Sequence, residues 1–360
     1  MTRLDTFRHE HPGTMRVLLG VVLFAVMIPV IDLLPAFRQG QVAQVAYTAI
    51  AAGGLTYLVG LSGQLSLGHG AFMAVGAYTT ALMLGAGINL WLTLVAAVLV
   101  TMAVGAVVGV AAARLQGPYI AGATLALSVA IPGLALHFSG IFGGEQGLRV
   151  PGQPIPQLLD DALFLITGTE VGRNRWLATL CVFFLIVTFV LLKNLAHSRV
   201  GRRWMAVRDD PVAAQLAGIN LGRARVECFI VSTACAGLAG ALMAIVIRIA
   251  APSGFHLVLS LTLLSAVVLG GLGSLLGAFL GSALLVLLPQ LTTNVGSAMG
   301  LSDLQAAEGA QLAVGVATVL VILFAPAGLV GTIRQKFRDR PTPTSPQTPA
   351  EVAAPEPARP

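Results

Sequence analysis

The interval that decides the fold runs from Gln39 to Ala113 and reads QGQVAQVAYTAIAAGGLTYLVGLSGQLSLGHGAFMAVGAYTTALMLGAGINLWLTLVAAVLVTMAVGAVVGVAAA. It contains no Asp, Glu, Lys or Arg, and the charged residues that bound it are Arg38 and Arg114. A helix needs about 20 apolar residues to cross the hydrocarbon core of a bilayer, so this interval has room for three crossings with their turns. Runs this long and continuous predict helices, because membrane barrels use strands of about 10 residues with alternating polarity.

The composition of the whole chain supports the same conclusion. Of 360 residues, 56% are hydrophobic and 10% are charged, and the mean hydropathy is +0.86. A soluble domain has about 25% charged residues, so a water-soluble globular enzyme is excluded. Further uncharged intervals cover residues 115–144, 176–192, 228–247, 249–302 and 309–333.

We predict an all-α polytopic membrane protein with about ten transmembrane helices, within a range of about 8 to 11. Residues 17–31 are kept as a crossing and not as a secretory signal, because Asp32 and Pro35 follow them and no small-residue cleavage site does. The expected crossings are residues 17–35, 42–60, 69–87, 89–112, 118–137, 176–194, 227–247, 257–272, 275–290 and 308–325.

The basic residues predict how the chain is oriented, because positively charged loops stay on the cytoplasmic side. With six crossings before the basic loop and four after it, three basic clusters fall on one side, and both termini are predicted to be cytoplasmic. The net charge of +6 therefore reflects topology and gives no reason to expect nucleic acid. The clusters are Arg3, Arg8 and Arg16, then Lys193, Arg199, Arg202, Arg203, Arg208, Arg223 and Arg225, then Arg334, Lys336, Arg338 and Arg340.

This topology divides the chain into a cytoplasmic N-terminal segment (1–16), a transmembrane domain (17–335) and a Pro-rich tail (336–360). The transmembrane domain includes an outer loop (138–175) and a basic cytoplasmic loop (195–226), here called the coupling loop. Because the tail mixes seven prolines after residue 340 with Ser, Thr, Ala and Glu, we expect it to be disordered.

The chain offers little chemistry of its own. Its two lysines, Lys193 and Lys336, are followed by Asn and Phe, whereas a P-loop requires Ser or Thr after its Lys. If ATP drives this protein, another subunit must supply the ATPase. Cys228 and Cys235 are too far apart on one expected helix for a disulfide, and with Cys181 they are interpreted as small packing residues.

The first unusual segment is Gly60-Leu-Ser-Gly-Gln-Leu-Ser-Leu-Gly-His-Gly-Ala-Phe72, here called the first broken segment. Glycines and polar side chains between two apolar runs predict a helix interruption, which membranes tolerate only inside protein or beside water. It either lines a pathway, with a half-helix N-terminus facing a carboxylate, or forms a tight turn with close helix packing. A lone histidine favours the structural interpretation for that residue. The candidate pathway residues are Gly63, Gln64, Ser66, Gly68 and His69.

The second broken segment, Val268-Leu-Gly-Gly-Leu-Gly-Ser-Leu-Leu-Gly-Ala-Phe-Leu-Gly281, repeats this character in the other half of the chain. Glycine-broken helices in corresponding places of two halves point to a transporter site between repeats. The spacing of Gly273, Gly277 and Gly281 also fits close packing through small residues. The candidate pathway residues are Gly270, Gly271, Gly273 and Ser274.

The coupling loop contains the third segment, Gly201-Arg-Arg-Trp-Met-Ala-Val-Arg-Asp-Asp-Pro-Val-Ala-Ala-Gln-Leu-Ala-Gly-Ile-Asn220. Asp210 followed by Pro211 predicts an N-cap with proline at the first helical position, and Gly218 predicts the end of the helix. A simple charged connector would touch only solvent or lipid headgroups. A capped helix with an apolar stripe, in contrast, needs a partner, which favours docking. The stripe is Val212, Leu216 and Ile219.

Several motifs together resemble one family, the permease subunits of bacterial ABC importers for branched-chain amino acids. The resemblance covers residues 17–335, and the long outer loop and ten crossings are similar to the larger of the two permease types. The motifs are Gly63-Gln-Leu-Ser-Leu-Gly-His-Gly-Ala-Phe72, Gly76-Ala-Tyr78, Gly143-Gly-Glu-Gln-Gly147, Arg208-Asp-Asp-Pro-Val-Ala-Ala-Gln-Leu-Ala-Gly-Ile-Asn220, Gly237-Leu-Ala-Gly-Ala-Leu242, Val268-Leu-Gly-Gly-Leu-Gly-Ser274 and Pro326-Ala-Gly-Leu-Val-Gly331.

The resemblance implies a transporter subunit of the bacterial inner membrane and not an enzyme. In such importers a periplasmic binding protein delivers the substrate, two homologous permeases form the path as a heterodimer within membrane lipid, and two ATP-binding cassette subunits power it. This chain would bind no cofactor, and ATP with Mg²⁺ would sit on the partner subunits. Asp-Pro-Val stands before the alanines where importers generally have Glu-Ala-Ala then Gly. The residues implied to couple to the ATPase are Arg208, Asp209, Asp210, Pro211, Ala213, Ala214, Gly218 and Ile219.

Two alternatives remain open at this stage. Permeases for urea or short-chain amides are similar enough that the substrate stays undecided between them and Leu, Ile or Val. A carrier or channel without ATPase subunits usually places an acid in a central crossing. Asp32 and Glu308 are the candidates here, and neither is central in its crossing.

Overall fold

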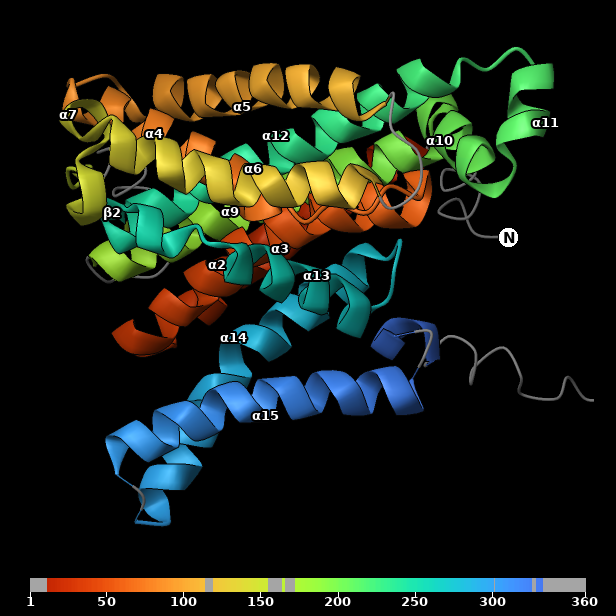
Figure 1. The fold of residues 1–360 in the computed structure, drawn as a ribbon. Coiled ribbons are helices and arrows are strands. Elements are labelled where there is room, and N and C mark those ends of the chain that lie inside the picture. Colours follow the sequence, from red (N-terminus) through yellow and green to blue (C-terminus); the bar gives the residue numbers. More distant parts are fainter. Residues whose placement is uncertain are drawn as a thin grey trace, which may run out of the picture.

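The computed structural model describes residues 12–113, 119–154, 164–165, 172–300, 302–325 and 328–332. These residues form a bundle of long helices with a short two-stranded ladder at one end (Figure 1). The predicted tail (336–360), most of the N-terminal segment (1–16) and much of the outer loop lie outside the described residues.

The elements follow one another along the chain as long helices with short links. Their bounds are α2 (Pro12–Asp32), α3 (Ala36–Ser62), α4 (His69–Gly85), α5 (Leu90–Ala112), α6 (Tyr119–His137), α7 (Ser139–Phe142), η1 (Gly144–Gln146), β1 (Leu148–Arg149), α9 (Arg173–His197), α10 (Arg199–Asp209), α11 (Pro211–Leu216), α12 (Leu221–Ile247), β2 (Ile249–Ala250), η2 (Pro252–Gly254), α13 (Leu257–Gly270), α14 (Leu275–Ala298) and α15 (Asp303–Phe324).

Each of the ten predicted crossings coincides with one of these helices. Among the described residues, eight helices are long and apolar enough to cross a membrane, and α4 and α15 occupy the other two predicted places. The all-α polytopic fold is therefore confirmed. The largest difference in bounds is in α14, which continues to Ala298, beyond the predicted end at residue 290, and contains Pro289 within the helix.

The predicted coupling loop also differs in detail. It contains two helices, α10 and α11, and α12 begins at Leu221, before the predicted start at residue 227. The start of α10 is explained by Ser198, whose side chain accepts hydrogen bonds from Val200 N and Gly201 N as an N-cap.

Helix α12 occupies the middle of the bundle, with α3, α4 and α5 packed on it. Small residues let these backbones approach closely. A Cβ on Gly76 would meet the backbone of Gly237, and one on Gly54 would meet Cys235. The three cysteines are free and buried, which confirms their role as packing residues.

Gly240 gives a direct test of this packing. A Cβ at that position would collide with the backbone of Met73 in α4, so Gly240→Ala should destabilise the protein by about 1–3 kcal/mol even though alanine favours helix. The matched control is Gly133→Ala in α6, where nothing lies within 4 Å of the added carbon. Thermal unfolding of the two purified variants measures the difference, and equal midpoints would contradict the close contact between α4 and α12 at Gly240.

One end of the bundle carries the ladder and the glycine turn of the outer loop. Leu148 of β1 pairs with Ala250 of β2 in an antiparallel register. Gly143, Gly144 and Gly147 all have positive φ, so the Gly-Gly-Glu-Gln-Gly motif is a tight turn that only glycine forms without strain.

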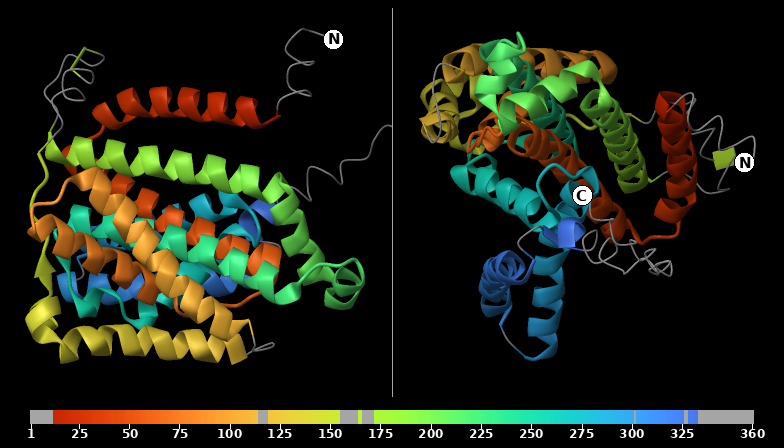
Figure 2. Two further views of the ribbon diagram at one scale, coloured as in Figure 1. Left: turned by 90° about the horizontal axis from the view of Figure 1, so that it is seen from above. Right: turned by 90° about the vertical axis from the view of Figure 1, so that its right-hand side faces the viewer.

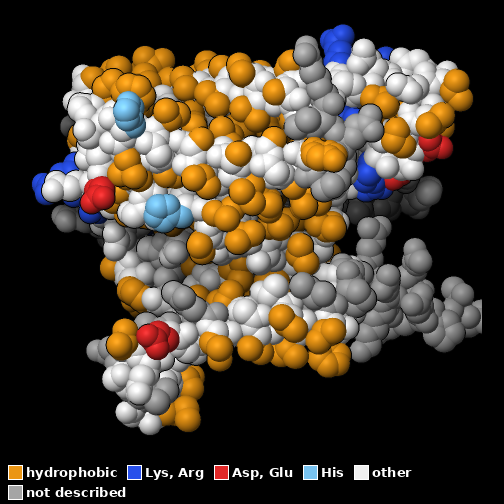
Figure 3. All heavy atoms as spheres, in the orientation of Figure 1, with side chains coloured by type: hydrophobic (Ala, Val, Ile, Leu, Met, Phe, Trp, Pro, Cys, Tyr) orange, Lys and Arg blue, Asp and Glu red, His pale blue; other side chains and the backbone are white. Residues whose placement is uncertain are grey.

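The opposite end carries α10 and α11, which project beyond the long helices (Figure 1). Helix α2 begins at the same end (Figure 2), where Arg16 donates to Asn194 Oδ1 of α9 at 3.0 Å. Charged side chains gather at the two ends, and the helix faces between them are mainly apolar (Figure 3). This distribution fits helices that run across a bilayer.

Helices α14 and α15 form an arm beside the main bundle (Figures 1 and 2). The arm joins the bundle through α13 and α3. Enclosure varies strongly among the helices: 89% of the apolar window of α3 is buried, against 11% for α2. Helix α3 is therefore an internal element of the bundle.

Candidate transport and coupling sites

The first broken segment is a real interruption between α3 and α4. Helix α3 ends at Ser62, and Gly63 takes a left-handed conformation with φ 70°. The chain then runs without helix to Gly68, and α4 begins at His69. The predicted break is confirmed in position.

Hydroxyl groups from two other helices satisfy the backbone of this break. Leu67 N donates to Thr124 Oγ1 of α6 at 3.0 Å, and Ser128 Oγ of α6 donates to Leu67 O at 2.6 Å. Gly70 N donates to Ser260 Oγ of α13 at 2.9 Å. The backbone around Leu67 and Gly70 therefore finds its hydrogen-bond partners inside protein, as irregular backbone at membrane depth requires.

The polar candidates of this segment are buried within the subunit. Gln64 donates to Arg225 O at 3.1 Å and to Ser62 Oγ at 2.6 Å, which ties the segment to the start of α12. Ser66 and His69 are fully buried. The His69 ring lies beside the Ala51 carbonyl of α3, but neither ring nitrogen makes a hydrogen bond of ordinary geometry with the described residues.

The second broken segment is also a real interruption. Helix α13 ends at Gly270, then Gly271 and Gly273 have φ 109° and 78°, and Ser274 caps α14 by accepting from Gly277 N at 3.1 Å. Only glycine takes the conformation of Gly271 readily, because its ψ of 123° lies outside the left-handed helical region.

Its glycines also serve the close packing that the spacing suggested. A Cβ on Gly277 would meet the backbone of Gly270, and one on Gly281 would collide with the Ala266 carbonyl. These two contacts hold α13 and α14 together as a tight hairpin. The segment thus combines a glycine turn with a small-residue interface.

The structure brings the two broken segments together at α3. A Cβ on Gly60, the first residue of the first segment, would collide with the backbone of Gly273 in the second. Gly273 N also donates to Thr56 Oγ1 of α3 at 2.9 Å. The stretch from Gln64 to His69 instead faces α6, α12 and α13.

Sequence reasoning missed Thr56, Thr124, Ser128 and Ser260. All four are buried hydroxyl residues inside otherwise apolar helices. Their signal in the sequence is weak, because a threonine or serine in a membrane helix can equally bond to its own helix backbone.

The capped helix of the coupling loop forms as predicted. Asp210 Oδ1 accepts from Val212 N at 2.9 Å and from Ala213 N at 3.0 Å, and Pro211 occupies the first turn of α11. Gly218 follows the helix with φ 80°. The predicted cap and stop are therefore confirmed.

The predicted apolar stripe divides into exposed and packed residues. Val212 and Leu216 are 66% and 87% exposed, whereas Ile219 packs against the core of the subunit. Ala214 is buried against its own chain. The surface that α11 offers to another molecule is therefore built around Val212 and Leu216.

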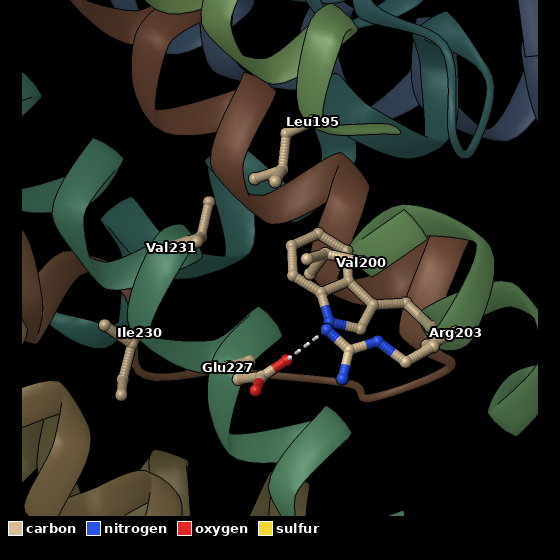
Figure 4. Close-up of a pocket in the computed structure, with 7 residues that line it drawn as sticks. Leu195, Val200, Arg203, Glu227, Ile230 and Val231 are labelled. Carbon is tan, nitrogen blue, oxygen red and sulfur yellow. Dashed lines mark ion pairs between the residues drawn. The ribbon is translucent and has the colours of Figure 1, made fainter. Parts of the chain in front are cut away.

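A pocket of about 300 Å³ lies where α10 leaves the bundle (Figure 4). Apolar side chains line most of it, and Arg203 of α10 and Glu227 of α12 form an ion pair across it with an N–O distance of 3.7 Å. Its lining residues are Leu195, Val200, Arg203, Trp204, Glu227, Ile230 and Val231.

The two acids considered for an ion-coupled carrier occupy unsuitable places. Asp32 at the end of α2 pairs with the buried Arg175 of α9 at 2.9 Å, which makes it a structural ion pair between helices. Glu308 is exposed in the early part of α15. This arrangement gives neither residue the character of a central ion-binding group.

Asp32→Asn should therefore affect stability and not transport. Removing the carboxylate breaks its ion pair with the buried Arg175 guanidinium, and breaking a buried ion pair costs about 3 kcal/mol. Thermal unfolding should shift clearly, while uptake per folded molecule stays close to wild type. Glu145→Gln, at an exposed residue, is the control. Loss of uptake in a stable Asp32→Asn protein would instead revive the carrier interpretation.

An all-helical membrane bundle with two interrupted, glycine-rich helices and a projecting capped helix has the architecture of a transport permease. The family described as branched-chain amino acid transport system permease component matches residues 40–326. The chain belongs to this family, which confirms the resemblance found in the sequence.

Individual relatives agree with the family match. Two relatives are the high-affinity branched-chain amino acid transport system permease proteins LivM of Salmonella typhimurium and Escherichia coli K12, and each is 30% identical to this chain. Each alignment covers 79% of this chain and 68% of the LivM protein. The corresponding LivH protein of Salmonella typhimurium is 26% identical, with 79% of this chain and 91% of LivH covered. These relatives are named as permease proteins of transport systems, and the identity to LivM is higher than the identity to LivH.

Proposed function

We propose that this chain is the membrane-spanning subunit of an ATP-driven importer of the branched-chain amino acids Leu, Ile and Val. The observation that carries the proposal is a family match over most of the chain combined with an exposed, capped helix in a sequence without a P-loop. A permease that cannot hydrolyse ATP needs a surface on which an ATPase acts, and α11 offers one.

The proposed assembly contains a second homologous permease, two ATP-binding cassette subunits and a periplasmic binding protein. Similarity to both LivM and LivH relatives supports a pair of related permeases, with this chain in the place of the larger one. ATP and Mg²⁺ bind to the partner subunits. The complex sits in the bacterial inner membrane with both termini of this chain in the cytoplasm, at the end where α11 projects.

The proposed mechanism is alternating access. ATP binding draws the cassettes together, and their movement displaces α10 and α11. Helices around the two broken segments then rearrange and pass the substrate inward. Both broken segments lie where one helix ends and the next begins, so the helices on either side can move without a continuous helix being broken. The pathway residues assigned from the sequence are Gly63, Gln64, Ser66, Gly68, His69, Gly270, Gly271, Gly273 and Ser274.

An importer of urea or short-chain amides is the alternative for the substrate. The names of the relatives favour branched-chain amino acids, because both LivM and LivH proteins are described as permeases for them. Competition for uptake by unlabelled Leu, Ile, Val and urea distinguishes the two substrates directly.

The experiment that tests the assembly is purification of the tagged chain from detergent-solubilised membranes. We expect a second permease and an ATP-binding subunit to co-purify, and the eluate to hydrolyse ATP. A chain that purifies alone and still moves an amino acid into liposomes would overturn the proposal in favour of a carrier or channel.

A further inference from the structure

Arg208, the last basic residue of α10, reaches from the surface of α10 to the end of α3. Its Nη1 donates to the carbonyl of Gly60 in the last turn of α3, although 148 positions separate the two residues in the sequence. Its Nε and Nη2 both donate to Asp209 Oδ1, at 2.8 and 2.6 Å. Asp209 therefore holds the guanidinium in the orientation that leaves Nη1 for α3.

Gly60, which accepts the hydrogen bond from Arg208, also contacts the second broken segment. Gly60 touches the backbone of Gly273 with no side chain between them. Thr56, one turn earlier in α3, accepts a hydrogen bond from Gly273 N at 2.9 Å. The last turns of α3 therefore make two contacts: Gly60 O accepts a hydrogen bond from Arg208 of α10, and Gly60 and Thr56 contact Gly273 in the turn between α13 and α14.

The contacts from Arg208 through Gly60 to Gly273 are closely packed. Gly60 is buried, and its backbone meets Gly273 directly, so a shift of the end of α3 must displace the second broken segment. On its far side that segment meets Gly328, whose Cβ would collide with Gly271. The helix turn after α15 is thereby placed against the same break.

We propose that Arg208 is a positioning residue that transmits movement of the coupling loop to the second broken segment through Gly60 and Thr56. This inference rests on the proposed function and adds a route to it. In the route, Arg208 acts on its own subunit through α3 and not, as the family resemblance had implied, by touching the ATPase. The residues that meet the ATPase are the exposed ones on α11, Val212 and Leu216.

Arg208→Ala tests the route in the reconstituted complex. The variant should still assemble and hydrolyse ATP at close to the normal rate, while uptake per ATP falls about tenfold, within the usual range of coupling between sites. Arg208→Lys, which keeps the positive charge and a donor nitrogen but not the planar fork, should recover part of the loss. The control is Arg202→Ala: Arg202 also lies on α10 and also donates to a carbonyl, but to the nearby His197 at 2.9 Å, so uptake should be unchanged.

A double-mutant cycle then asks whether Arg208 and Thr56 act together. Thr56→Val removes the acceptor for Gly273 N and keeps the shape of the side chain. If both residues belong to one route, Arg208→Ala with Thr56→Val should be no worse than the more severe single variant, whereas Arg202→Ala with Thr56→Val should be additive. Normal uptake per ATP in Arg208→Ala, or additive losses in the first pair, would overturn the inference.

Thermal unfolding of the full-length variants separates this inference from the proposed function. The same cycle, measured as unfolding free energies, requires no transport. Coupling between the changes at 208 and 56 would support the contact route even if wild type showed no ATP-driven uptake, and its absence there would count against the route by itself. ATP-independent uptake by wild type would refute the proposed function alone.

Discussion

Leu216→Glu is expected to abolish ATP-driven uptake while the protein inserts and folds normally. Leu216 is 87% exposed on α11 and contributes nothing to the core of the subunit, so the change should not unfold it. If α11 docks in an apolar groove of an ATPase, a buried carboxylate there leaves an uncompensated charge and should weaken binding by more than about tenfold. Retention of the ATPase subunit on tagged permease, together with uptake, measures the effect.

Gln215→Glu is the control for this substitution. It adds the same charge one residue away on the same helix, at a polar and exposed position, so the ATPase should stay bound. Ala214 and Gly218 are less suitable, because Ala214 is buried in its own chain and Gly218 has positive φ. Full uptake by Leu216→Glu would show that α11 is not the coupling surface.

Gly281→Val has the second largest expected effect, this time on folding. Gly281 of α14 faces the Ala266 carbonyl of α13 so closely that even a Cβ would collide with it. Because the obstacle is backbone, no side chain rotation relieves the clash, and the cost should reach or exceed the usual 1–3 kcal/mol for overpacking. We expect little folded protein in size-exclusion chromatography after detergent extraction.

The control for helix propensity is Gly315→Val in α15. Valine is equally unfavourable in that helix, but nothing lies within 4 Å of the added Cβ. Equal yields of the two variants would mean that the α13–α14 hairpin is not held by glycine contacts, and the second broken segment would then lack its proposed support.

The helices and their caps could be predicted from the sequence, because both depend on residues that are close together in the chain. The uncharged interval from Gln39 to Ala113 predicted three helices, and α3, α4 and α5 lie there. The Asp210 cap, Pro211 and Gly218 predicted α11 to within a residue or two, since capping depends on neighbours in the chain. Helix ends were predicted less well: α14 contains Pro289 and runs past its predicted end at residue 290 to Ala298.

Contacts between distant segments could not be predicted in this way. The contact between Gly60 and Gly273 depends on how α3 packs against the turn between α13 and α14. Both residues are glycines, so neither has a side chain from which the contact could be predicted. Arg208 was predicted to lie in a cytoplasmic loop and, by resemblance, to couple to the ATPase, and nothing in the sequence indicated that it donates to α3. The choice of which membrane face is cytoplasmic, and the roles of the candidate pathway residues, stay predictions.

The most direct test of the account is uptake of labelled leucine by proteoliposomes that contain this chain with its co-purified permease and ATPase partners. With the loaded binding protein added, we expect uptake that requires ATP and disappears when the P-loop lysine of the ATPase is replaced. Unlabelled isoleucine and valine should compete. Leucine uptake that continues without ATP, or in vesicles holding this chain alone, would contradict the assignment as an ATP-driven importer subunit.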